Sequence, residues 1–372
     1  MKFTFTQSSI LKSIQRVVGA VSSKMPMPAL TNFHLKLDGQ TLTITATDLE
    51  VTVSSTVELL EAAGSGGVLI QAKRFQELIR ELPDVPLEVE VQDPFKVTLR
   101  GEGIGVYNLP GEDPIDFPEL PVVDSKLSFA IAGDRFKRMI AKTIFAVSKD
   151  EMRPVLTGIL FQLRPGEMRV VATDGHRLSR VICSDIPFDG EPRDQIVPIK
   201  AVNLLLRNLS DDEELVIALA ETRASFTAAS QRLITRLIDG HYPKYESVIP
   251  TTNPNRLRIK MSDLMSGVRR VSIFSSHISR QIKLSLGGGI GAIEAEDPEY
   301  GGRAREEMSI DYTGESIEIA YNATYLMEAL RQVDTEEANF ELAGSNDAAI
   351  IRPSSQQDGE DFLMLLMPIR LR

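Results

Sequence analysis

Three stretches of the chain are variants of one strand: TLTITATD at 41–48, MRVVATDGHRL at 168–178 and IGAIEAED at 290–297. Each contains alternating β-branched or apolar residues and an Asp, which is typical of a strand followed by a turn. The shared Ala and Asp return about every 125 residues, so we infer that the chain contains three copies of one plan.

Two helices are expected in each copy. Apolar residues at i, i+3 and i+4 predict one amphipathic helix before the quoted strand and a second helix after it. Asp134 and Asp263 are predicted to be N-caps, because their carboxylates can accept hydrogen bonds from free N–H groups of the first turn. The first helices are predicted at 8–21, 134–147 and 262–274, and the second at 73–82, 200–209 and 322–333.

A further strand precedes each quoted stretch, at 33–37, 158–163 and 282–286, which predicts an antiparallel hairpin in every copy. More short strands complete each copy. The expected fold class is therefore α+β, with three similar domains that each pack two helices on an antiparallel β-sheet. Pro-containing stretches at 121–126 and 250–255 are predicted to be linkers. The expected domains are then 1–122, 123–250 and 251–372.

Composition excludes several classes of protein. No apolar run approaches the roughly 20 residues of a membrane-spanning helix, and the N-terminal segment lacks the features of a signal peptide. The single cysteine, Cys183, excludes an internal disulfide and a cysteine-based zinc site. The four histidines do not have the spacing of metal ligands. We expect a cytoplasmic protein without metal or cofactor.

The charge is distributed unevenly along the chain. The net charge is −11, yet the segments around the six helices (7–24, 73–81, 134–149, 200–210, 261–280 and 322–333) hold 17 Lys and Arg against 5 Asp and Glu. A set of basic helices in an acidic chain is suited to sequence-independent contact with DNA phosphates. The alternative is an ordinary solvated helix surface. The candidate DNA-binding residues are Lys12, Arg16, Lys24, Lys73, Arg74, Arg80, Arg135, Lys137, Arg138, Lys142, Lys149, Arg153, Lys200, Arg207, Arg269, Arg270 and also Arg331.

Two other functions stay open at this point. Asp174 and His176 could serve as an acid–base pair of a hydrolase, although a turn after a strand explains the shared Asp. A repeat scaffold that binds peptides but not DNA is the other alternative. The glycine-rich stretch at 287–291 is predicted to be a hairpin turn, because no helix follows it and a dinucleotide site needs one.

Several motifs resemble those of one known family. ATDGHRL at 172–178, LMPIRL at 366–371 and MRPVLTG at 152–158 are similar to signatures of the bacterial DNA polymerase III β subunit, the sliding clamp. The resemblance extends over the whole chain, and the combination is specific. The third-domain segment 294–305 is longer and richer in glycine than this family leads us to expect.

The resemblance implies a non-catalytic processivity factor with the DNA clamp fold, in which two protomers form a head-to-tail ring around duplex DNA. It also implies a pocket for a short linear motif of the polymerase III catalytic subunit, the clamp loader, other polymerases and repair proteins. The implied dimer residues are Ile104, Val106, Ile273 and Phe274. The implied pocket residues are Leu156, Thr173, Gly175, His176, Arg177, Leu178, Pro243, Val248, Asn322, Tyr325, Met367, Pro368, Ile369 and Arg370.

Overall fold

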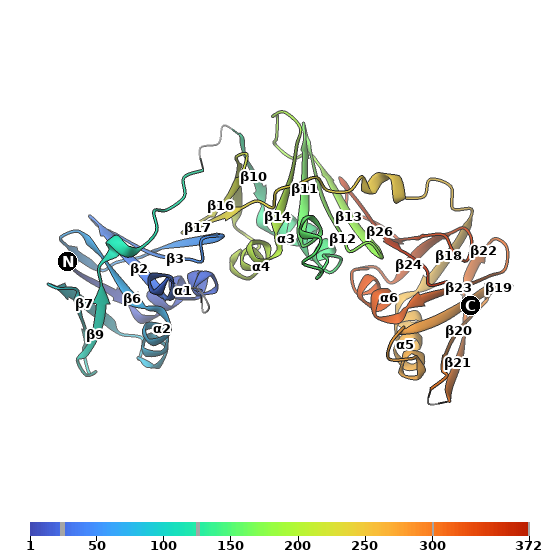
Figure 1. Cartoon of the computed structure of the whole chain (residues 1–372), viewed down its shortest axis with the longest axis horizontal. Coiled ribbons are helices and arrows are strands. Elements are labelled where there is room, and N and C mark those ends of the chain that lie inside the picture. Colours follow the sequence, from blue (N-terminus) through green and yellow to red (C-terminus); the bar gives the residue numbers. More distant parts are fainter. Residues whose placement is uncertain (23–26, 124–126, 300, 371–372) are drawn as a thin grey trace. The chain divides into compact units, whose positions relative to one another are not determined.

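The computed structural model describes residues 1–22, 27–123, 127–299 and 301–370 (Figure 1). It forms two compact units. One unit contains Met1–Lys137 and Lys200–Leu237, and the other contains Arg138–Ile199 and Ile238–Arg372. The threefold α+β plan is confirmed. The border between the units runs through the middle repeat, because each unit contains sheet pairing between two successive repeats.

Within the described residues, the three repeats have the same order of elements, except that the second lacks the short strand that β5 (Glu61–Ala63) and β22 (Asp311–Thr313) form in the others. The first contains β1 (Lys2–Thr6), α1 (Gln7–Val17), β2 (Asn32–Asp38), β3 (Thr41–Thr47), β4 (Val51–Val57), β5 (Glu61–Ala63), β6 (Gly66–Gln71), α2 (Ala72–Glu81), β7 (Pro86–Gln92), β8 (Lys96–Gly101) and β9 (Tyr107–Glu112). The second contains β10 (Leu127–Ala132), α3 (Gly133–Ile144), β11 (Gly158–Arg164), β12 (Glu167–Thr173), β13 (Arg177–Ser184), β14 (Arg193–Pro198), α4 (Ile199–Asn208), β15 (Glu214–Leu219), β16 (Arg223–Ala228) and β17 (Gln231–Arg236).

The third repeat contains β18 (Asn255–Lys260), α5 (Met261–Val271), β19 (Gln281–Gly287), β20 (Ile290–Asp297), β21 (Gly302–Ser309), β22 (Asp311–Thr313), β23 (Ile317–Asn322), α6 (Ala323–Leu330), β24 (Glu337–Leu342), β25 (Ala349–Pro353) and β26 (Glu360–Leu366). The predicted hairpin at 287–291 is confirmed, since β19 pairs with β20 across it. Gly288 and Gly289 have φ of +59° and +78°, which glycine adopts without steric cost.

The predicted N-caps are wrong. α3 begins at Gly133 and α5 at Met261, so Asp134 and Asp263 lie inside the first turn of their helices. The reason is that each first helix follows directly on a strand, which moves its start toward the N-terminus. Their carboxylates still lie at the positive end of the helix dipole, where a negative charge is favourable. The predicted C-terminal turns of the first and third copies are 3₁₀ turns, at Val18–Ala20 and Ser272–Phe274.

Sheet pairing joins successive repeats. In the first unit, thirteen strands form one sheet in the order β10-β15-β16-β17-β4-β3-β2-β6-β9-β8-β7-β1-β5. β4 of the first repeat pairs there with β17 of the second, and Val53 lies opposite Leu233. In the second unit, nine strands follow the order β14-β11-β12-β13-β26-β25-β24-β18-β22, and β13 pairs with β26 of the third repeat. The remaining four strands form a sheet in the order β21-β20-β19-β23.

The helices cover these sheets with their apolar residues. α1 packs on β3 and β4 and against α2, and its Ile10, Ile14 and Val17 are fully buried. α5 packs in the same way on β20 and β21 and against α6, through Leu264, Val268 and Val271. Each fully buried aliphatic side chain contributes about 1.5–3 kcal/mol, so the apolar face of each helix fixes which side faces solvent. Most charged residues of the helices are thereby left on the opposite side, with Arg16 and Lys142 as buried exceptions.

Candidate nucleic-acid interface and partner site

Six cations of the helices are exposed and make no ion pair within the part of the chain that the structure describes. They belong to α1, α2, α4 and α5, so they occur in all three repeats and in both units. Such side chains are available to phosphate oxygens. They are Lys12, Lys73, Arg74, Arg80, Arg207 and Arg269. Lys149, in the loop after α3, and Arg331, after α6, are exposed as well, whereas the predicted Lys24 lies outside the described residues.

Other predicted cations are bound to carboxylates at or near the surface. The pairs are Lys137–Asp211, Arg138–Glu360, Arg153–Asp150, Lys200–Asp48 and Arg270–Glu306. Exposed ion pairs contribute little to stability. A phosphate could therefore compete for the exposed members of this group. Arg135 is half-buried.

Arg16 and Lys142 differ from all the others because they are buried, each with 7% of its surface exposed. Arg16 donates to the hydroxyl of Ser230 and lies 3.7 Å from a carboxylate oxygen of Glu213. The Lys142 amine lies 3.0 Å from Asp334. Burial leaves little of either cation accessible to a phosphate, so a structural role explains both better than DNA contact.

The predicted partner site is built around the turn between β12 and β13. Oδ1 of Asp174 accepts hydrogen bonds from the backbone N–H groups of His176 and Arg177, at 2.9 and 3.0 Å. Gly175 has φ of +92°, and an added Cβ would lie 3.2 Å from the Arg153 guanidinium. The Asp174 carboxylate is therefore engaged in shaping the turn. Asp174 accepts from the backbone of His176 and not from its imidazole, so the two side chains are not arranged as an acid–base pair.

Arg177 connects this turn to α6. Its side chain is 9% exposed, and its guanidinium donates to Asp174 at 3.1 Å, to Glu328 of α6 and to the carbonyl of Phe145 at 2.6 Å. The same guanidinium lies over the rings of Phe145 and Tyr325, at 5.2 and 4.5 Å. The sequence suggested a direct peptide contact for this residue. With its donors occupied in this way, Arg177 is placed to hold the turn against α6.

His176, Tyr325 and the chain after β26 meet on the surface side of that turn. The rings of His176 and Tyr325 stack at 6.1 Å, and the Met367 N–H donates to the His176 carbonyl at 2.9 Å. Asn322 caps α6, since its side chain accepts from the N–H groups of Thr324 and Tyr325. The Ile369 N–H donates to the Ala320 carbonyl at 2.7 Å. Pro368 is half-buried, whereas Met367 and Arg370 are exposed.

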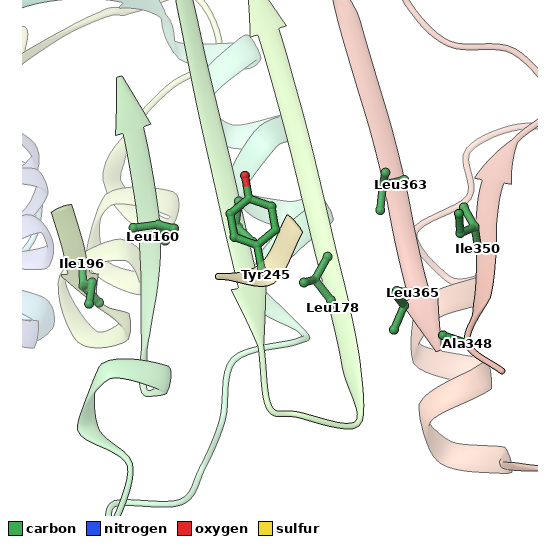
Figure 2. Packing of buried hydrophobic residues seen from close by; sticks show 9 residues of the cluster. Leu160, Leu178, Ile196, Tyr245, Ala348, Ile350, Leu363 and Leu365 are labelled. Atoms are coloured by element: carbon green, nitrogen blue, oxygen red, sulfur yellow. The ribbon is translucent and has the colours of Figure 1, made fainter. Parts of the chain in front are cut away.

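A second group surrounds Leu178 on the sheet. Leu178 is buried in a cluster with Tyr245 and Leu365, and Figure 2 shows Tyr245 beside Leu178 over the strands. The Thr173 N–H donates to the Tyr242 hydroxyl at 3.0 Å, which attaches the segment after β17 to β12. Leu156 is buried, and Pro243 and Val248 are exposed.

The sequence prediction did not include Tyr242, Tyr245 or Leu365. The sequence feature that could have identified them is their aromatic or apolar character, in chain segments next to the predicted site residues. Burial raises the pKa of both phenols, that of Tyr245 to about 12, so both stay protonated as hydrogen-bonding groups near neutral pH. The Tyr245 hydroxyl donates to Gln162 at 2.7 Å.

Two cavities adjoin the turn. One, of about 370 Å³, is lined by His176, Tyr325 and Arg153. The other, of about 550 Å³, is lined by Phe145 and Arg331. Arg177, Glu328 and Lys149 line both cavities.

The residues predicted for dimer contact lie outside the strands, two in each unit: Ile273 and Phe274 in the 3₁₀ turn after α5, and Ile104 and Val106 in the loop between β8 and β9. Ile273 and Phe274, after α5, are 74% and 41% exposed. Among the described residues, β21, close to that helix, pairs with β20 alone, which leaves one edge of its eight residues open. In the other unit, Val106 is 64% exposed and Ile104 is half-buried, just before β9. An exposed apolar edge of this kind can pair with another chain.

No group of three or more His, Cys, Asp or Glu side chains in the described residues could hold a metal ion. None of the described helices is long and apolar enough to cross a membrane. The fold and its surface define a protein of three α+β repeats whose helices carry exposed positive charge and whose strand edges are open for assembly.

Comparison with known proteins gives the family. Models of the N-terminal, central and C-terminal domains of the DNA polymerase III beta subunit match residues 1–121, 130–244 and 246–370. The beta sliding clamp of Pseudomonas aeruginosa is 33% identical, with 100% of both chains covered, and that of Chlamydia muridarum is 32% identical, with 100% of this chain and 99% of the relative covered. The chain belongs to the DNA polymerase III beta subunit family.

Comparison with solved structures leads to the same family. The fold is similar to a sliding clamp of Pseudomonas aeruginosa bound to griselimycin, with a TM-score of 0.94 and 32% identity over the whole of both chains. A DNA polymerase III beta subunit of Thermotoga maritima gives a TM-score of 0.90 at 25% identity, again over both whole chains. Members of the family are non-catalytic processivity clamps of DNA replication. The hydrolase alternative is thereby excluded.

Proposed function

We propose that two copies of this chain close into a ring around duplex DNA and tether the replicative polymerase to it. Family membership is the observation that carries this proposal. The exposed edge of β21 and the exposed Val106 before β9 lie in different units of the chain, as head-to-tail contact between two copies requires. The proposed dimer residues are Ile104, Val106, Ile273 and Phe274.

We propose that the exposed helix cations contact DNA phosphates without reading its sequence. The strongest candidates are the cations that are exposed and make no ion pair with a described residue: Lys12, Lys73, Arg74, Arg80, Arg207 and Arg269. Contacts of this kind are weak individually and screened by salt, which is compatible with sliding. The negative charge of the whole chain, −11, opposes adhesion of DNA elsewhere on its surface.

The turn after β12 is the proposed site for a short linear motif of the polymerase, the clamp loader and repair proteins. His176, Tyr325 and Met367 lie together on one side of this turn, and Leu178 with Tyr242 lies on the other. An extended peptide could cross both groups with apolar side chains. A partner attached in this way gains a high effective concentration at the DNA it works on.

We propose domain borders near residues 122 and 250, in the segments that connect β9 to β10 and β17 to β18. A sheet continues across each border, because β4 pairs with β17 and β13 pairs with β26. The domains are then 1–122, 123–250 and 251–372.

The test is retention on nicked circular DNA after loading by a compatible clamp loader. A ring held by topology stays on the circle and is released when one restriction cut makes the DNA linear. Equal retention on circular and linear DNA would show ordinary surface binding. Failure to load, with a control clamp loaded by the same loader, would favour the scaffold that binds peptides alone.

A further inference from the structure

The tenth residue of the first helix is a cation in all three repeats. These residues are Arg16 in α1, Lys142 in α3 and Arg270 in α5, and we call them the joint cations. Two of the three are buried, which is costly for a charged group unless it is paired. Their partners show what this helix position does.

Arg16 and Lys142 each cross to the following repeat. Arg16, in the first repeat, lies 3.7 Å from Glu213, which comes after α4 of the second repeat. Lys142, in the second repeat, lies 3.0 Å from Asp334, which comes after α6 of the third repeat. Lys142 also lies 3.8 Å from Glu360, so it bridges two carboxylates. Both contacts accompany the strand pairing that joins the same repeats, β4–β17 and β13–β26.

Arg270, by contrast, forms an ion pair only within its own repeat in the described part of the chain. Its side chain is 60% exposed, and it donates two hydrogen bonds to Glu306 of β21, at 2.8 and 2.7 Å. β21 follows β20 as β4 follows β3 and β13 follows β12, so it holds the position of the joining strand, with its outer edge unpaired. Both the third joint cation and the third joining strand therefore lack the partner that the first two have.

We infer that Arg270 forms an ion pair with Asp84 of a second copy of this chain when two protomers meet, and that it is not a DNA contact. This inference rests on the proposed ring, in which the third repeat of one copy precedes the first repeat of the other. Asp84 is the acidic residue between α2 and β7, as Glu213 and Asp334 follow α4 and α6. Asp84 is exposed, and its Oδ1 accepts a hydrogen bond from the backbone N–H of Ser8 at 3.0 Å.

In the closed joint Arg270 bridges Glu306 of its own repeat and Asp84 of the partner, whereas both carboxylates near Lys142 belong to the following repeat. The guanidinium has enough donors for both carboxylates. In the free protomer, two hydrogen bonds to Glu306 and contacts with water occupy the donors of the Arg270 guanidinium. Opening the joint between protomers therefore breaks the pair with Asp84 and leaves the pair with Glu306 intact.

The experiment uses two full-length single variants, Arg270→Asp and Asp84→Arg, alone and mixed. Each homodimer has two joints with like charges, whereas the mixed dimer has one exchanged pair and one native pair. Sedimentation velocity and native mass spectrometry over a dilution series give the dimer dissociation constants. Lys260→Glu, an exposed change at the other end of α5, is the matched control.

Each single variant is expected to dimerise at least tenfold more weakly than the unchanged protein, and the mixture is expected to recover most of that loss. Recovery in the mixture cannot come from repaired folding, because each chain keeps its own substitution. Single variants that dimerise normally, or a mixture no tighter than its components, would overturn the inference while leaving the ring intact. An unchanged protein that stays monomeric and leaves nicked circles would instead overturn the proposed function.

Discussion

The guanidinium of Arg177 lies over the ring of Tyr325, with 4.5 Å between Cζ and the ring centroid. This contact joins β13 of the second repeat to α6 of the third, and the ion pair of Arg177 with Glu328 strengthens it. Tyr325 in turn stacks on His176. The proposed partner site therefore depends on an interaction beneath it as well as on the residues that face a peptide.

Replacing Arg177 with Ala is expected to destabilise the protein by about 3–5 kcal/mol, because it leaves Asp174 and Glu328 without their cation in a largely buried place. Arg177→Lys keeps the charge but loses the planar contacts, and we expect it to weaken binding of a partner-motif peptide by at least tenfold. Urea unfolding and peptide titration measure the two effects. Arg153→Ala, at an exposed arginine that donates to the Asp174 carbonyl from the loop after α3, is the control and should cost less than 1 kcal/mol. Equal losses in both alanine variants would contradict this role.

Replacing Tyr242 with Phe is expected to cost about 1–3 kcal/mol, because the Thr173 N–H loses its acceptor while the ring stays packed. Peptide affinity should fall as well, since the segment after β17 is then held less firmly beside the turn. Tyr312→Phe removes a hydroxyl that donates to the Glu315 carbonyl at the surface, and it should change neither quantity appreciably. Equal urea midpoints for the two variants would contradict a stabilising role of the Tyr242 hydroxyl.

Reversing two exposed cations of α2, Lys73→Glu with Arg74→Glu, should reduce retention on DNA and make it less sensitive to salt. Each lost phosphate contact lowers the slope of log affinity against log salt by about 0.9, so a change of roughly two is expected. Lys36→Glu with Lys96→Glu changes the net charge equally, at exposed residues of β2 and β8. Similar losses in both double variants would indicate that total charge, and not the helix surface, governs binding.

His34 is expected to make the first unit less stable as the pH falls below about 6.5. Burial, with a smaller contribution from Lys36, lowers the pKa of this imidazole in the folded chain. The unfolded chain therefore binds more protons between the folded pKa and 6.5, so stability is present above this range and is lost as the pH falls through it. The ring packs 5.0 Å from that of Phe117.

His34→Gln should flatten this pH dependence, as measured by thermal unfolding between pH 5 and 8. His277→Gln, at an exposed histidine of the third repeat, provides the comparison and should keep the slope of the unchanged protein. An unaltered slope in His34→Gln would show that other groups cause the dependence.

The sequence by itself determined the repeated plan. Alternation and helical spacing are local patterns, and they identified the six helices and the three central hairpins, such as the one between β19 and β20. The Asp of each repeated strand end was correctly interpreted as a turn residue, since Asp174 binds the N–H groups that follow it. Local pattern also showed that positive charge collects on helices, because burial of the apolar face leaves the charged face outside.

Tertiary structure decided what individual cations do. Arg16 and Lys142 have the same sequence signal as Lys12, yet they are buried against carboxylates or hydroxyls of the next repeat. Arg177 matched a peptide-contact motif, but its donors are occupied by residues distant in sequence. Burial and pairing depend on which strands join across repeats. A local pattern contains no information about residues some 150 positions apart, such as Arg177 and Glu328, so only the folded chain separates surface charges from those that hold its repeats together.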